Sequence, residues 1–294
     1  MKTIKQLLTE ANSKLRKNSI KTARLDAEVI LSFVLNKPKE YLYTYPEGIV
    51  SKDTINRFLT LIKKRSSHYP IAYLTNNKEF FGLDFYVDEN VLVPRPETES
   101  LVEETLKEVK TRLIASPHSE INIAEIGTGS GCIAVALAKE VETRLIASPP
   151  IKIMATDISA AALKIARRNA RKHKVLSRIK FYQGNLLEPL KNKKIDLIVA
   201  NLPYLDSDYK NLLNSSDKKA LKFEPSLALY SGKEGLNHYA EFFEQVAELK
   251  HKPKFILVEF GPKQTSALKK IIHQNLGPAK LTKVQPGTLM IELT

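Results

Sequence analysis

Apolar residues recur with helical spacing along the first part of the chain. Between Ile4 and Leu15 they fall at positions i, i+3, i+4, i+7 and i+11, which places them on one face of a helix. The pattern repeats over residues 23–35, and Ser51 is a suitable N-cap for a further helix through Ile62. We therefore expect residues 1–75 to form a small helical domain.

The pattern changes over residues 78–93, where Phe, Leu and Val side chains recur around Gly82 and predict a β-hairpin. The stretch Val-Pro-Arg-Pro-Glu-Thr-Glu follows, and Pro96 stiffens it because proline disfavours a helical conformation at Arg95. A helix is expected to begin at Glu97 and Glu99, since acidic residues favour that end. Residues 76–98 would link two domains, either as a rigid connector alone or as a connector that also lines the active site.

From Ile121 onward, short apolar runs alternate with helical patterns, which is typical of a doubly wound α/β domain. The predicted strands are 121–126, 151–156, 179–182, 195–200, 255–260, 281–284 and 289–293. The predicted helices are 132–141, 160–173, 235–249 and 264–276. We expect residues 99–294 to form this domain, with its last pair of strands antiparallel. The heptapeptide Thr-Arg-Leu-Ile-Ala-Ser-Pro occurs at 111–117 and 143–149, where helices would run into loops, and we interpret it as a tolerated duplication.

The chain carries a formal net charge of +14, and its first 70 residues hold fourteen Lys and Arg against six Asp and Glu. Such a surface suits a nucleic acid, a ribonucleoprotein or an acidic protein partner, but it is equally expected of solvated lysine-rich faces. A single cysteine, Cys132, excludes an internal disulfide, and six scattered histidines show no metal-ligand spacing, so no metal is expected. Without a signal peptide or a membrane-spanning run, we expect a soluble cytoplasmic protein.

A glycine-rich loop, Glu-Ile-Gly-Thr-Gly-Ser-Gly, joins the first predicted strand to its helix. Its ligand-facing part comprises Gly127, Thr128, Gly129, Ser130 and Gly131. Alternate glycines permit a tight turn and a close approach by a dinucleotide, a phosphate or adenosylmethionine. The next strand ends in Asp157, whose carboxylate could accept both ribose hydroxyls of an adenosine compound, cap the following helix, or do both. The third strand ends at Asn185 and Leu186, an expected adenine-edge position.

The fourth predicted strand ends in Asn201-Leu202-Pro203-Tyr204, beside the glycine loop. Alone, these residues are as typical of a turn as of a site. Ligands of doubly wound sheets bind beyond the carboxyl ends of the strands. An adenosine cofactor and this tetrapeptide would therefore face each other.

The glycine loop, Asp157 and Asn201–Tyr204 together resemble the class I adenosylmethionine-dependent methyltransferases with an Asn-Pro-Pro-Tyr type motif. Further stretches resemble the release-factor glutamine methyltransferases, and they span nearly the whole chain. They are Arg24–Glu28, Pro70–Leu74, Glu79–Leu83, Val91–Glu99, Phe223–Pro225, Gly232 and Gly235–Leu236. The resemblance implies a Rossmann-like methyltransferase sheet, with a helical domain that helps to dock the protein substrate.

The resemblance also implies S-adenosylmethionine as cofactor, bound by the glycine loop, Asp157, Asn185, Leu186 and Asn201. The substrate would be the glutamine of the Gly-Gly-Gln motif in class-1 peptide chain release factors, methylated on its side-chain N5. We expect a monomer, with no obligate nucleic acid and no membrane partner. Arg95 and Glu97 are expected to join residues 201–204 in binding the substrate.

The chemistry can be reasoned from the tetrapeptide. An amide nitrogen is a poor nucleophile, and a base strong enough to deprotonate it is implausible at neutral pH. We expect Asn201 Oδ1 to accept one amide hydrogen and the Leu202 carbonyl the other, which would direct the nitrogen at the methyl group. Pro203 would fix that carbonyl by restricting Leu202 to an extended form, and Tyr204 would pack on the planar amide. Asn201, Pro203 and Tyr204 are therefore the expected catalytic residues.

This sequence departs from the family pattern at three positions of the expected site. Leu202 replaces a proline, Asn185 stands where an acid is usual, and Glu125 where aspartate is usual. Three alternatives stay open: a ribosomal-protein glutamine methyltransferase, a nucleic-acid adenine-N6 methyltransferase favoured by the charge, and an inactive adenosylmethionine-binding module.

Overall fold

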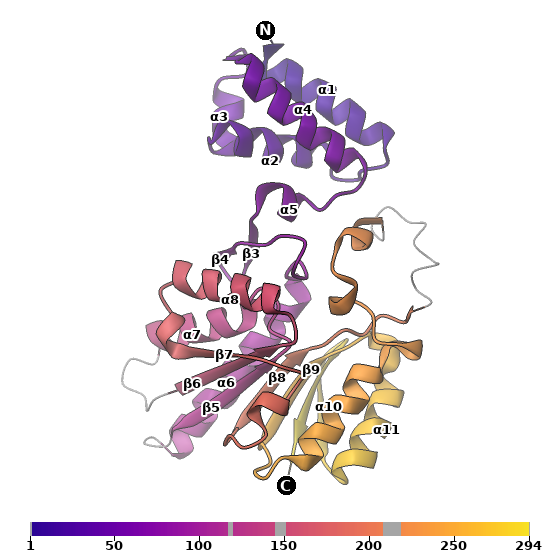
Figure 1. Cartoon of the computed structure of the whole chain (residues 1–294). Helices are drawn as coiled ribbons and strands as arrows, with labels where there is room; N and C mark the ends of the chain where they lie inside the picture. The colour runs from indigo at the N-terminus through magenta and orange to yellow at the C-terminus, as the bar shows by residue number, and fades with distance from the viewer. Residues whose placement is uncertain (1, 117–119, 145–150, 208–218, 294) are drawn as a thin grey trace. The chain divides into compact units, whose positions relative to one another are not determined.

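The computed structural model describes residues 2–116, 120–144, 151–207 and 219–293. They form two compact units (Figure 1). The sheet unit comprises residues 78–212 and 225–294, and the helical unit comprises residues 1–77 and 213–224. The sequence placed this stretch in the α/β domain, whereas its described residues, 219–224, group with the helices. Phe223 shows one reason, because its ring contacts that of Tyr69 with the centroids 5.0 Å apart.

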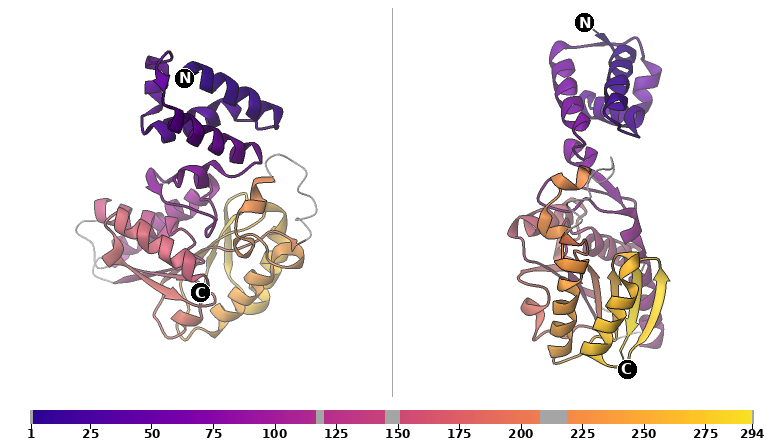
Figure 2. Two further views of the ribbon diagram at one scale, coloured as in Figure 1. Left: turned by 45° about the horizontal axis from the view of Figure 1, so that its top comes forward. Right: turned by 90° about the vertical axis from the view of Figure 1, so that its right-hand side faces the viewer.

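A seven-stranded sheet forms the centre of the sheet unit, in the order β10-β11-β9-β8-β5-β6-β7. Its parallel strands are β5 (Ile121–Ile126), β6 (Ile151–Asp157), β7 (Ile179–Gln183), β8 (Leu197–Asn201) and β9 (Phe255–Glu259). β11 (Thr288–Glu292) runs antiparallel to both of its neighbours, β9 and β10 (Lys280–Gln285). β7 and β10 are the edge strands (Figures 1 and 2). The predicted Rossmann-like sheet with an antiparallel end is confirmed.

Helices cover both faces of this sheet. Ile198 and Ala200 of β8 belong to the core that α10 (Asn237–Glu248) and α11 (Thr265–Leu276) complete. Val199 points to the other face because strand side chains alternate. On that face α6 (Glu99–Ala115) contacts β8 and β9, while α7 (Cys132–Arg144) contacts β6 and packs against α8 (Ala160–Lys172). Burial on both faces explains why the strands are nearly continuous apolar runs.

The predicted hairpin is real but shorter than residues 78–93. β3 (Lys78–Phe80) pairs with β4 (Leu83–Phe85), and Gly82 takes a positive φ of 71° in the turn. Beyond Phe85 the prediction of a strand was wrong. The backbone of Tyr86 bonds instead to the side chain of Asn169 in α8, donating to Oδ1 at 2.8 Å and accepting from Nδ2 at 2.9 Å. A side chain thus supplies the partners that a second strand would have supplied.

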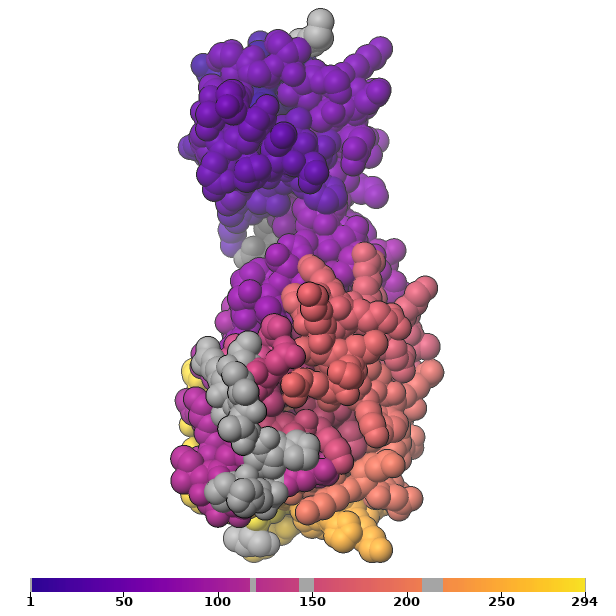
Figure 3. Space-filling view, turned by 90° about the vertical axis from the view of Figure 1, so that its left-hand side faces the viewer, coloured from indigo at the N-terminus to yellow at the C-terminus, as the bar shows by residue number. Residues whose placement is uncertain are grey.

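The outer side of α8 is basic and faces solvent at Lys164, Arg168 and Arg171. Figure 3 shows this side of the sheet unit in pink to salmon. The first copy of the repeated heptapeptide ends α6 as expected, with the helix stopping at Ala115. Pro117 and residues 145–149 of the second copy lie outside the described residues. Within the described ranges, no helix is long and apolar enough to cross a membrane.

The helical unit has the helices predicted from residues 4, 23 and 51 onward, with two short ones added. They are α1 (Ile4–Lys17), α2 (Ala23–Leu35), α3 (Lys39–Thr44), α4 (Lys52–Ser66) and α5 (Ile71–Thr75). Two short strands, β1 (Lys2–Thr3) and β2 (Ile49–Val50), pair antiparallel. Ser51 caps α4 as predicted, its side chain accepting from the Thr54 N–H at 3.3 Å. Fully buried Leu7, Ile30 and Phe58 bring α1, α2 and α4 into one core.

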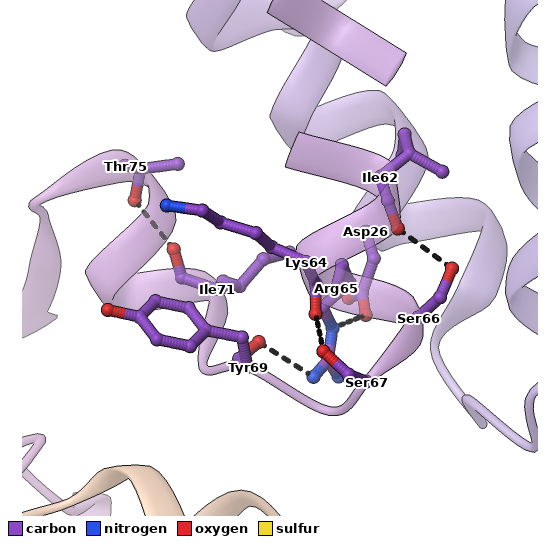
Figure 4. Close-up of polar contacts among 9 residues, drawn as sticks. All are labelled: Asp26, Ile62, Lys64, Arg65, Ser66, Ser67, Tyr69, Ile71 and Thr75. Atoms are coloured by element: carbon purple, nitrogen blue, oxygen red, sulfur yellow. Dashed lines mark hydrogen bonds and ion pairs between the residues drawn. The ribbon is translucent and has the colours of Figure 1, made fainter. Parts of the chain in front are cut away.

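A largely buried ion pair joins α2 to α4 in this unit (Figure 4). Arg65 Nε donates to Asp26 Oδ2 at 2.6 Å, and its Nη1 donates to the Tyr69 carbonyl at 3.1 Å. Asp26 belongs to the stretch Arg24–Glu28 that carried part of the family resemblance. Its carboxylate therefore has a structural role, since it holds two helices of the unit together.

Candidate active site

A cavity of about 1090 Å³, including its open mouth, lies at the carboxyl ends of the parallel strands. Most of the residues expected from the sequence line it. These are Arg95, Gly127, Thr128, Gly129, Ser130, Asp157, Asn185, Leu186, Asn201, Leu202 and Pro203. Gly131, Glu97 and Tyr204 are not among its lining residues. The topology explains the gathering, because parallel strands bring their carboxyl ends to one edge of the sheet.

The glycine loop turns sharply between β5 and α7. Gly127, Gly129 and Gly131 have positive φ values of 74°, 54° and 80°, which L side chains rarely adopt. A Cβ added at Gly129 would meet no described atom within 4 Å, so this position opens toward the cavity. One added at Gly131 would lie 3.0 Å from the Cβ of Ala166 in α8. Gly131 therefore allows helix packing behind the loop.

Asp157 ends β6 and is bonded to the backbone on both sides. Its Oδ2 accepts from Gly129 N–H and its Oδ1 from Ser159 N–H, each at 2.8 Å. Each oxygen keeps a further lone pair for a ligand hydroxyl. Burial is the main reason why the pKa of this carboxyl is raised. The expectation that Asp157 caps the next helix needs correction, because Ser159 is the N-cap of α8 and accepts from Ala162 N–H at 3.2 Å.

Asn185 follows β7 and lines the cavity beside Leu186. Its Nδ2 donates to Glu241 of α10. A carboxylate can only accept, so this bond orients the amide and leaves Asn185 Oδ1 free of that contact. Asn185 Oδ1 is therefore an acceptor at the cavity wall, at the position where the sequence predicts an adenine-edge contact.

Asn201 is the last residue of β8 and is paired in register with Glu259 of β9. Its Nδ2 donates to Thr98 Oγ1 at 2.9 Å, so the amide nitrogen is engaged by Thr98 and Oδ1 is not part of that bond. The Leu202 carbonyl lies 3.4 Å from the hydroxyl of buried Tyr239, and that hydroxyl makes a shorter bond to the Glu259 carbonyl. Since a carbonyl has two lone pairs, Leu202 keeps capacity to accept another hydrogen.

Of the remaining residues predicted for the site, two line the cavity and two do not. Pro203 and Arg95 line the cavity, whereas Glu97 is exposed and outside the lining. Tyr204 packs against the core beside α10 and α11, and burial raises the pKa of its hydroxyl to about 12. Its backbone carbonyl accepts from Gln264 Nε2 at 2.9 Å.

Glu125 is a buried acid beneath the glycine loop. Its Oε2 accepts from Thr128 Oγ1 at 2.6 Å and from Ala134 N–H at 3.1 Å, which ties the loop to the first turn of α7. Burial outweighs both bonds and raises the pKa of the carboxyl to about 8. No group of His, Cys, Asp and Glu among the described residues is arranged to hold a metal ion.

Two further polar side chains of the cavity lining, Thr98 and His238, were not predicted as site residues from the sequence. Thr98 is 3% exposed and contacts Asn201, yet a threonine at the start of a helix is typical of a cap and gave no signal of its own. His238 lies on α10, and its ring Nδ1 is bonded to Ser231 Oγ at 2.7 Å. Burial lowers the pKa of this imidazole.

Models of known protein families match both units of the chain. The PrmC N-terminal domain matches residues 6–75, and a methyltransferase domain matches residues 117–275. A release factor glutamine methyltransferase of Moorella thermoacetica is 35% identical over 267 residues, covering 91% of this chain and 88% of its own. The chain belongs to the release factor glutamine methyltransferase family.

Other relatives place this family membership in context. A bifunctional methyltransferase of Rickettsia felis is 35% identical over 294 residues, which is 93% of this chain but 54% of that protein. The chain thus spans about half the length of these bifunctional relatives. Among solved structures, the N-terminal domain of human METTL16 superposes with a TM-score of 0.52 at 14% identity, over 90% of this chain and 92% of that one. This similarity supports the fold alone.

The cavity fits the S-adenosylmethionine that methyltransferases of this family use. The open face at Gly129 allows backbone contact, and Asp157 keeps acceptor capacity for ribose hydroxyls. Asn185 Oδ1 offers an acceptor for the adenine amino group. These three positions come from successive loops of the same sheet edge, so one extended adenosine ligand could reach all of them.

Proposed function

We propose that the protein transfers a methyl group from S-adenosylmethionine to the side-chain N5 of the glutamine in the Gly-Gly-Gln motif of peptide chain release factors. Family membership supports the reaction class and the substrate. Within the site, the proposal is supported most strongly by the hydrogen bond that Asn201 Nδ2 donates to Thr98 Oγ1 at 2.9 Å. With its nitrogen engaged there, Asn201 presents Oδ1 as an acceptor for a substrate N–H.

The substrate amide needs two acceptors, because it has two hydrogens and a nitrogen whose lone pair is delocalised. Asn201 Oδ1 accepts one hydrogen, and the Leu202 carbonyl, with its spare lone pair, accepts the other. Holding both hydrogens fixes the plane of the amide and aims the nitrogen at the electrophile, so orientation supplies much of the rate. The bound cofactor supplies a methyl group on a sulfonium, which carries its own leaving group.

Pro203 acts on this arrangement through the backbone. It disfavours a helical conformation at Leu202 and so holds that carbonyl in an extended segment. The proline usual at position 202 is not required for this effect, because the acceptor is a backbone carbonyl. Leu202 also contributes packing, since a Cβ at Gly127 would lie 3.2 Å from its Cδ2. The tetrapeptide and the glycine loop therefore fit each other closely.

The helical unit is proposed to dock the release factor, as the match of residues 6–75 to the PrmC N-terminal domain supports. We further propose that the protein acts in the cytoplasm as a monomer. Its Arg95, which lines the cavity, is proposed to contact the substrate backbone near the glutamine.

The test is methyl transfer from labelled cofactor to purified acceptors. The panel contains a release factor, the same factor with its Gly-Gly-Gln glutamine changed to alanine, a mixture of ribosomal proteins, and DNA. Label is expected on the unmodified release factor alone. Label on DNA or ribosomal proteins, or label that survives the glutamine change, would refute the proposed substrate.

A further inference from the structure

Glu259 is a buried carboxylate immediately beside Asn201. It ends β9, is 5% exposed, and stands opposite Asn201 in the parallel register of β8 and β9. Its Oε2 has no hydrogen-bond partner among the residues that the structure describes. A buried acid at the carboxyl end of a central strand is costly, and neither the packing of the sheet nor the cavity lining accounts for it.

The carboxylate belongs to a small network around the Asn201 amide. Asn201 Nδ2 donates to Thr98 Oγ1 at 2.9 Å. Thr98 and Asn201 both lower the pKa of the Glu259 carboxyl, as polar groups beside a carboxylate do. The Thr98 hydroxyl, having accepted from Asn201, keeps a proton that it can donate to the carboxylate.

We infer that Glu259, acting with Thr98, is a positioning residue that sets the orientation of the Asn201 amide for methyl transfer. An ionised carboxylate has no proton to donate, so only the nitrogen side of the Asn201 amide can face it. Oδ1 is then held toward the substrate. This inference rests on the proposed function, because it concerns the acceptor that the substrate amide needs.

Protonation of Glu259 removes the preference for the nitrogen side of the Asn201 amide. A neutral carboxyl can donate to Oδ1, which allows the Asn201 amide to turn and present Nδ2, a donor, to the substrate. Burial is the largest reason why the pKa of Glu259 is raised, to about 7. The charges facing it are Arg95, which lowers that pKa, and Glu97, which raises it, while the hydroxyls of Tyr204 and Tyr239 lie close by. The orienting form is thus the one present above neutral pH.

The structural test follows the Asn201 side-chain amide by NMR in protein labelled with ¹⁵N-asparagine, with the signal assigned from its loss in Asn201→Ala. In the wild type, both amide protons are expected to shift with pH around a midpoint near 7. In Glu259→Gln that titration should disappear. The control is Glu292→Gln, the same change on neighbouring β11, which should titrate as the wild type does. An Asn201 signal that ignores pH, or that titrates equally in Glu259→Gln, would overturn the inference.

The kinetic test measures kcat and KM against pH with a release factor as substrate. The wild type should lose kcat about tenfold per pH unit below the Glu259 pKa. Glu259→Gln should lower kcat by about ten- to a hundredfold at high pH, with KM little changed and the acid limb gone, as expected for loss of a charged hydrogen bond. Thr98→Val should lower kcat while Thr98→Ser, which keeps the hydroxyl, restores it. Wild-type activity in Glu259→Gln would refute the role.

The two tests separate two kinds of failure. A wild-type protein that methylates no release factor contradicts the proposed function, whereas the NMR titration still reports on the Asn201 amide. A wild-type protein that methylates its substrate, combined with an Asn201 amide insensitive to Glu259, contradicts the positioning role alone.

Discussion

Asn169 is the residue whose loss should most clearly weaken the sheet unit without touching the tetrapeptide. It is 0% exposed and makes three side-chain bonds. It accepts from Tyr86 N–H at 2.8 Å and donates to the carbonyls of Tyr86 and Ser130 at 2.9 and 2.8 Å. It thus ties the segment after the hairpin and the glycine loop to α8.

Asn169→Ala should lower the free energy of unfolding of the sheet unit by about 3 kcal/mol. Each bond contributes roughly 1 kcal/mol net, and partners left unsatisfied in a buried position cost more, so about 5 kcal/mol is the upper bound. Because Ser130 belongs to the glycine loop, affinity for S-adenosylmethionine should fall as well.

Guanidinium denaturation followed by far-ultraviolet circular dichroism suits this measurement, since the chain has no tryptophan. The transition of the sheet unit should move to lower denaturant concentration with an unchanged slope. Asn275→Ala is the matched control, because Asn275 makes one bond, to the Ile271 carbonyl at 3.0 Å. A loss in Asn169→Ala no larger than in the control would refute the assigned role.

Three further substitutions test the helical unit, the glycine loop and the tetrapeptide. Asp26→Ala should destabilise the helical unit by about 3 kcal/mol in thermal unfolding, because the largely buried Arg65 guanidinium loses its carboxylate and keeps only its bond to the Tyr69 carbonyl. A change below about 1 kcal/mol would contradict this. Glu125→Gln should remove a pH dependence of the free energy of unfolding. The folded-state pKa of Glu125, about 8, exceeds the usual 4.5, so the wild type should lose about 5 kcal/mol of stability as pH rises from about 4.5 through 8. An identical pH dependence in the variant would refute this. Asn201→Ala should abolish turnover while calorimetry finds cofactor affinity largely intact; a large loss of affinity would show that its role is misassigned.

The sheet and the two-unit organisation could be predicted because the relevant patterns are local. Strands buried on both faces give continuous apolar runs, and helices over 4–15 and 23–35 give apolar stripes. The predicted hairpin was too long because the alternation of apolar residues continues to Val93. No local feature of the sequence shows that Asn169, 83 residues away from Tyr86, bonds to the Tyr86 backbone instead.

The site was harder to predict where residues act through others. Gly127, Asp157 and Asn201 stand at strand ends, so topology alone brings them together. Thr98 lies in the stretch Val91–Glu99 that carried part of the family resemblance, but nothing in the sequence assigned it a role. Glu259 gave no signal, because an acid at the end of a strand is ordinary in sequence. Their relation to Asn201 depends on the β8–β9 register and on the entry to α6, which only the folded chain specifies.

Fragment mass spectrometry of the treated release factor locates the atom that receives the methyl group. A single added methyl group is expected on the glutamine side-chain nitrogen of the Gly-Gly-Gln peptide, present with the wild-type protein and absent with Asn201→Ala. A methyl group on any other atom of the release factor, or equal methylation by Asn201→Ala, would contradict the proposed reaction.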